Sequence, residues 1–104
     1  MLSRIQLRQF LAVVDTGGFT RAAHSLNVAQ PSLSAGIAQL ERELGTHLFV
    51  RERRRIRLTE AGNALLPIAR AIERDFHRAE RQIGSLPVPI RPARLGVLES
   101  IATK

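Results

Sequence analysis

The sequence has no cysteine, and its three histidines lie far apart among 104 residues. A chain without thiols forms no disulfide, no cysteine-based zinc site and no thiol nucleophile. The sequence also lacks a nucleophile elbow and a glycine-rich phosphate loop. We therefore expect no enzyme, no catalytic residues, no metal site and no cofactor.

Long apolar segments are missing as well. No run of apolar residues approaches the roughly 20 that are needed to span a bilayer. Arg4 and Arg8 interrupt the stretch that would form the apolar part of a signal peptide. We therefore expect a cytoplasmic protein that makes no use of a membrane.

Positive charge, by contrast, is plentiful. Of the 16 basic residues 15 are arginine, and the net charge is +7. The excess is concentrated in residues 46–59, where five arginines accompany one glutamate. Arginine suits phosphate recognition, so this cluster favours a local site for an anionic partner. A solvated basic loop and a surface for anionic membranes are the alternatives.

Apolar residues at helical spacing predict three short helices in the first 45 residues. Their inward faces comprise Leu7, Phe10, Leu11 and Val14, then Phe19, Ala22, Ala23 and Leu26, then Leu33, Ile37, Leu40 and Leu44. Ser3 and Gln6 form a capping box that begins the first helix, and Gly45 ends the third.

The pattern changes after residue 46. Residues 48–51 and 55–58 predict two strands of a hairpin, with Ile56 and Leu58 facing inward. Thr59 caps a long helix over 60–84, which we expect Pro67 to kink. Its apolar stripe is too long for the three helices to cover, which indicates pairing with a second chain. The stripe includes Leu65, Ile68, Ile72, Phe76, Ala79 and Ile83.

Charge on the long helix is interpreted as a solvated face. Arginines at positions 70, 74, 78 and 81 are balanced by Glu73, Asp75 and Glu80. Residues 85–93 form a proline-rich hinge, and residues 94–104 begin with a single predicted strand.

Three helices followed by a basic hairpin have the layout of a winged helix-turn-helix. Over about residues 2–85 the sequence resembles the N-terminal domain of LysR-type bacterial transcriptional regulators. The matching segments are residues 10–14, 18–23, 26–34, 37–41, 44–45, 48–51 and 58–62. The expected fold is mainly α: a winged helix-turn-helix of three helices and a small hairpin, followed by a long linker helix.

The resemblance implies a homodimer that binds double-stranded operator DNA at an interrupted palindrome. By position, the recognition helix would contact DNA through Gln30, Pro31, Ser32, Ser34, Ala35 and Gln39. Thr20 and Arg21 match the helix that flanks the DNA backbone. The wing would contribute Arg51, Arg53, Arg54 and Arg55 to the backbone or the minor groove.

This sequence departs from the family pattern at several positions. Gly18 and Ala29 occupy two expected N-caps where serine is frequent, and Ala35-Gly36 replaces longer polar residues. We therefore expect base discrimination to depend on Gln30, Ser34, the Ala35 methyl group and the wing.

The expected organisation has four parts. A DNA-binding domain covers residues 1–59, a dimerisation helix 60–84 and a hinge 85–93. From the resemblance we expect residues 94–104 to be the beginning of the family's effector domain, with the rest of that domain and its small-molecule site absent from this chain. The resemblance also implies that full-length relatives are often tetramers. A rival hypothesis is an interaction protein that dimerises with full-length relatives and blocks them.

Overall fold

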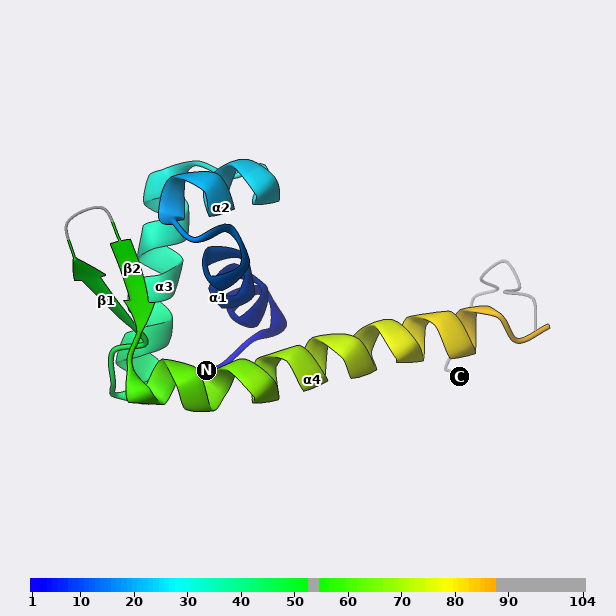
Figure 1. Ribbon diagram of the computed structural model, residues 1–104. Helices are drawn as coiled ribbons and strands as arrows, with labels where there is room; N and C mark the ends of the chain where they lie inside the picture. The colour runs from blue at the N-terminus through cyan, green and yellow to red at the C-terminus, as the bar shows by residue number, and fades with distance from the viewer. Residues whose placement is uncertain (53–54, 88–104) are drawn as a thin grey trace.

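The computed structural model describes residues 1–52 and 55–87. Its elements are α1 (Arg4–Thr16), α2 (Phe19–Leu26), α3 (Gln30–Leu44), β1 (Phe49–Glu52), β2 (Arg55–Leu58) and α4 (Glu60–Gly84). The first three helices and the hairpin form a body, and α4 extends from its base (Figure 1). The expected order of three helices, a hairpin and a long helix is confirmed. The expected turn residues 53–54, the hinge beyond residue 87 and the strand after 94 lie outside the described residues.

The core lies where α1, α2 and α3 meet, and its largest fully buried side chains include Phe10, Leu33 and Leu40. The predicted faces of α2 and α3 are buried except at their ends, and Leu44 is exposed in the last turn of α3. On α1, however, Val13 is buried while Val14 is only partly covered. The reason is that α1 contacts α2, α3 and α4, so its buried face is wider than a single stripe.

The hairpin is antiparallel, and Phe49 pairs with Leu58 at its base. Its alternation is as predicted, since Ile56 and Leu58 are partly covered whereas the arginines of β2 are exposed. Phe49 joins the hairpin to the body. Its ring centroid lies 5.3 Å from that of Phe10 and 5.9 Å from that of Phe19.

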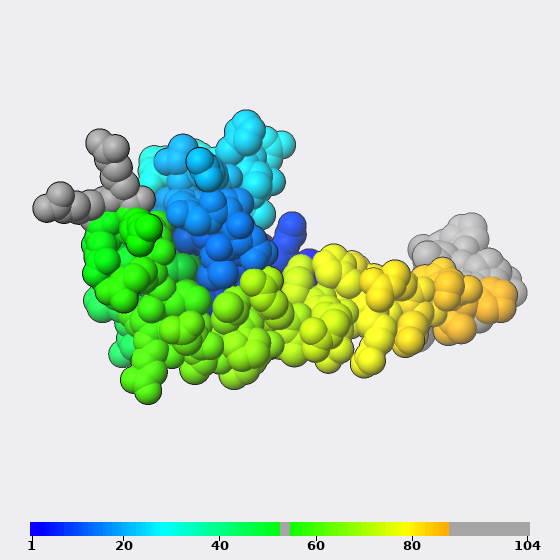
Figure 2. Space-filling model, in the orientation of Figure 1, coloured from blue at the N-terminus to red at the C-terminus, as the bar shows by residue number. Residues whose placement is uncertain are grey.

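Helix α4 has a covered half and an uncovered half. Near its start, Leu65 and Leu66 contact the core and Ala69 is fully buried. Beyond the body the helix projects away from the other helices and strands of the described residues (Figure 2). The helix continues through Pro67 without a break, and no sharp kink is visible (Figure 1). None of the helices in the described residues is both long and apolar enough to cross a membrane.

Candidate nucleic-acid interface

The N-terminal part of α3 presents small and polar side chains to solvent. Gln30, Pro31, Ser32 and Ala35 are exposed, whereas Leu33 on the opposite side is fully buried. The Gln30 amide donates a hydrogen bond of 3.1 Å to the hydroxyl of the half-buried Ser34. This bond holds an amide and a hydroxyl together on one slim face. Both groups can donate to and accept from base edges.

The helices begin in two different ways. Ser3 caps α1 through a capping box, and the Thr59 hydroxyl accepts a 3.0 Å hydrogen bond at the start of α4. The expected N-caps Gly18 of α2 and Ala29 of α3 are confirmed, and neither helix has a side-chain cap among the described residues. In the first turns of α2 and α3, backbone N–H groups therefore have no side-chain cap as acceptor. These groups can bind an anion such as phosphate.

A groove separates the start of α2 from the hairpin. It is lined by Thr20 and Arg21 of α2 and by Arg51 and Arg55 of the two strands. The Arg51 guanidinium lies 4.1 Å from the centroid of the Phe19 ring, an arrangement that favours a cation–π contact. The structure thus brings together four residues that the sequence predicted from separate segments. Three guanidinium groups beside a helix start are suited to phosphate oxygens.

The remaining arginines of the basic cluster differ from these. Arg57 donates two hydrogen bonds to Glu52, at 3.1 and 2.6 Å. These bonds lower the pKa of Glu52 and raise the pKa of Arg57, so the pair stays charged and mutually neutralised. Arg53 and Arg54 lie outside the described residues.

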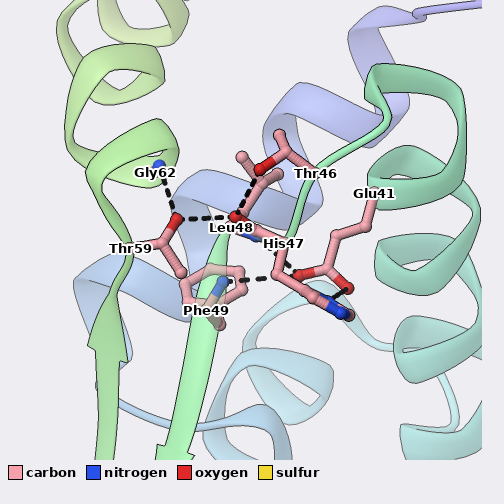
Figure 3. A network of polar contacts seen from close by, with 7 residues as sticks. All are labelled: Glu41, Thr46, His47, Leu48, Phe49, Thr59 and Gly62. Carbon is pink, nitrogen blue, oxygen red and sulfur yellow. Dashed lines mark hydrogen bonds and ion pairs between the residues drawn. The ribbon is translucent and has the colours of Figure 1, made fainter.

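A polar network joins α3 to the segment that enters β1 (Figure 3). One carboxylate oxygen of Glu41 accepts hydrogen bonds from the backbone N–H groups of Leu48, at 2.7 Å, and Phe49, at 3.3 Å. The Thr59 hydroxyl donates to the His47 carbonyl oxygen at 2.6 Å. Together these bonds fix the position of the hairpin relative to α3.

Sequence reasoning missed the role of Glu41. Its carboxylate accepts a hydrogen bond from a backbone N–H group seven residues further along the chain. Nothing in the apolar spacing predicts that contact. Gly62 also belongs to this junction, because a Cβ there would collide with the backbone carbonyl oxygen of Leu48. No alternative residue at position 62 would let α4 begin so close to the strand.

Comparison with known proteins places this geometry in a family. Residues 5–63 match the model described as "Bacterial regulatory helix-turn-helix protein, lysR family". The chain belongs to the LysR family. This LysR-family chain is 44% identical over 80 residues to an HTH-type transcriptional regulator in the ibpB-leuC intergenic region of Azotobacter vinelandii, covering 77% of this chain and 56% of that one. It is 44% identical over 77 residues to the HTH-type transcriptional regulator HdfR of Escherichia coli, covering 74% of this chain and 28% of HdfR. The chain therefore spans about half the length of the first relative and just over a quarter of the second.

Solved LysR-family structures have the same fold. The CbnR_DBD–DNA complex superposes with a TM-score of 0.75 at 36% identity, covering 81% of this chain and 97% of that one. The BenM_DBD/catB site 1 DNA complex gives a TM-score of 0.75 at 34% identity, with coverages of 82% and 99%. The predicted winged helix-turn-helix with a long following helix is confirmed.

The predicted pairing stripe of this LysR-family chain lies largely uncovered. Ile68, Ile72, Phe76 and Ile83 are 39–67% exposed, and Ala79 is exposed as well. Leu65 is different, since it contacts the core of its own chain.

Gln39, on the C-terminal half of α3, is exposed and donates to Glu43.

The charges of α4 are paired differently from the expectation. Asp75 accompanies Arg78 on the helix, as expected, but Glu73 binds Arg4 of α1 and Arg70 binds Asp15 of α1. Charge on this part of α4 therefore joins two helices. The described residues hold no cluster of three or more potential metal-ligating side chains.

Proposed function

We propose that this chain binds double-stranded operator DNA sequence-specifically, as a homodimer on an interrupted palindrome. The observation that carries the proposal is the continuity between the polar face of α3 and the arginine-lined groove. Arg51 lines the groove that contains Thr20, Arg21 and Arg55, and also a second groove that contains Ser34. Base-directed and phosphate-directed groups thus share one surface. The DNA complexes of the similar CbnR and BenM domains support the same assignment.

The proposed roles divide between bases and backbone. Gln30 and Ser34 would read base edges in the major groove, and Ala35 would contact a thymine methyl group. Pro31, Ser32 and Gln39 would flank them.

On the backbone side, phosphate contacts would come from Thr20, Arg21, Arg51 and Arg55 and from the N–H groups at the starts of α2 and α3. Arg53 and Arg54 keep this role on sequence grounds alone.

The dimer would form through α4. In the described part of the chain Ile68, Ile72, Phe76 and Ile83 remain 39–67% exposed, and two such stripes would cover each other. The pairing residues would be Leu65, Ile68, Ile72, Phe76, Ala79 and Ile83.

The wider role would be regulatory rather than enzymatic, in the cytoplasm. We propose the same division as the sequence suggested: residues 1–59 for DNA, 60–84 for pairing, 85–93 as hinge and 94–104 at the edge of an effector domain. In longer relatives that domain would hold the small-molecule site.

Selection from a random duplex library tests the proposal. We expect an enriched two-fold motif and steep loss of binding with added salt, because arginine–phosphate contacts release counterions. Gln30→Ala should broaden the motif. Arg55→Ala should weaken binding to all duplexes and reduce the salt slope by about 0.9.

The matched control is Arg81→Ala, which removes the same charge at the far end of α4 and should leave the slope unchanged. Salt-dependent binding without an enriched motif would contradict sequence specificity. Absence of binding at low salt would contradict DNA binding and favour the interaction-protein hypothesis. Co-sedimentation with anionic liposomes in place of DNA binding would favour the membrane alternative.

A further inference from the structure

Two ion pairs attach opposite ends of α1 to α4. Near the start of α1, Arg4 donates to both carboxylate oxygens of Glu73, at 3.2 and 2.9 Å. Near its end, Asp15 accepts a hydrogen bond of 2.9 Å from Arg70. The α4 residues involved adjoin Ala69, which is fully buried. In Figure 1, α1 is seen nearly end-on while α4 lies across the view, so the helices cross steeply.

The two pairs are unequal. The Glu73 side chain is only 17% exposed, and besides Arg4 it lies 3.8 Å from Arg8 and 3.3 Å from His77. The Arg4 guanidinium also lies 3.8 Å from the centroid of the Phe76 ring. Because it is bidentate and partly shielded, the Arg4–Glu73 pair restrains geometry more strongly than an exposed pair does. Both members of the Asp15–Arg70 pair are about half exposed.

This arrangement restrains rotation at the crossing. The packing of Ala69, Leu65 and Leu66 against the body is non-directional, whereas the ion pairs at both ends of α1 oppose a change in the angle between the helices. The start of α3 lies at the opposite side of the body from α4 (Figure 1). A turn of the body against α4 would therefore change the position of the α3 start relative to α4, and with it the relation between the two α3 helices of a dimer.

We propose that Glu73 is a positioning residue that sets the angle between α4 and the DNA-binding body. Through that angle it selects the separation of the two half-sites that the dimer accepts. This inference rests on the proposed function, because half-site spacing has meaning only for a dimer on DNA. Glu73 itself touches no DNA in this role.

A distance measurement tests the angle without DNA. The chain has no cysteine, so His24→Cys and Gln82→Cys allow spin labels on α2 and on the far part of α4. Labelled chains are mixed with excess unlabelled chain, so that only distances within one protomer are recorded. We expect one narrow distance distribution in the parent chain and a broader or shifted one in Glu73→Gln.

The matched control is Glu80→Gln. It removes the same charge from the same helix, but the Glu80 carboxylate contacts His77 of α4 rather than α1. Arg4→Gln breaks the pair from its other side and should reproduce the effect of Glu73→Gln. Circular dichroism verifies that each variant is folded.

The second readout is the spacing preference. The half-site selected from the random library is placed as inverted repeats whose separation is stepped by single base pairs over one turn, about 10 base pairs. The parent chain and Glu80→Gln should share one sharp optimum. In Glu73→Gln the ratio between the best and worst spacings should fall several-fold, while selectivity within a single half-site is kept.

An unchanged distance distribution or an unchanged spacing profile in Glu73→Gln would overturn the inference. A dimeric parent chain without any spacing preference would overturn it too and would leave the DNA-binding proposal standing. A parent chain that sediments as a monomer on DNA would overturn the dimer itself, so sedimentation distinguishes the two failures.

Discussion

The body and the far half of α4 contain the same kinds of apolar residue but bury them to different extents. Phe10 and Leu33 in the body are fully buried, whereas Phe76 and Ile83 on α4 remain 41% and 67% exposed. Apolar spacing is helical in both regions. The comparison teaches that periodicity identifies the face of a helix that will be covered, but not whether its own chain covers it.

The largest expected effect is a loss of stability on removing a buried ring from the body. Phe10→Ala removes a fully buried ring that contacts Phe49, and should lower the free energy of unfolding by about 3–5 kcal/mol. Phe76→Ala removes the same ring from a site that is 41% exposed, and should cost less than half as much. Urea unfolding of both variants, at a concentration where the chain is monomeric, makes the comparison. Equal losses would contradict the assignment of Phe76 to an uncovered face.

The second prediction concerns dimerisation through the far half of α4. Ile72→Lys together with Phe76→Lys should weaken dimerisation by about hundredfold, or about 2.7 kcal/mol, because charge replaces the apolar contact. The free energy of unfolding of the monomer should fall by less than it does in Phe10→Ala, since Ile72 is 39% and Phe76 41% exposed. Sedimentation measures the association. A double variant that remains dimeric would refute the α4 interface.

Third, the junction between the two regions is sensitive at one glycine. Gly62→Ala places a methyl group against the Leu48 carbonyl oxygen, and should lower the free energy of unfolding by about 1–3 kcal/mol. At Gly84 a Cβ meets nothing within 4 Å, so Gly84→Ala should be neutral or slightly stabilising. Thermal unfolding of the two variants distinguishes a close approach from a general glycine effect.

Much of the fold follows from local patterns in the sequence. The capping box at Ser3, the alternation of β2 and the cap at Thr59 each depend on residues within a few positions of one another, so spacing and turn chemistry suffice to predict them. Four of the predicted DNA-contacting residues, Thr20, Arg21, Arg51 and Arg55, were likewise brought to one groove.

What sequence reasoning missed depends on contacts between distant residues. Arg4 and Glu73 are 69 positions apart, and their pairing follows from the crossing of α1 over α4. Glu41 accepts a hydrogen bond from the backbone N–H group of Leu48, and the turn before β1 sets the direction of that group. Val13 is buried because three helices surround α1. No period within one segment contains that information.

The smallest expected effects come from substitutions at helix N-caps, and they compare a helix that has a side-chain cap with one that has none. Thr59→Ala removes the hydroxyl that caps α4, and should cost about 1 kcal/mol of unfolding free energy. Ala29→Ser supplies a hydroxyl where α3 has no side-chain cap, and should add about 0.5–1 kcal/mol. Thermal unfolding gives both values, and DNA binding should respond differently. A serine hydroxyl that occupies the first-turn N–H groups of α3 competes with phosphate, so Ala29→Ser should stabilise the fold without raising DNA affinity in proportion. If it raised both equally, the start of α3 would act through stability alone, and its backbone N–H groups would have no part in holding DNA.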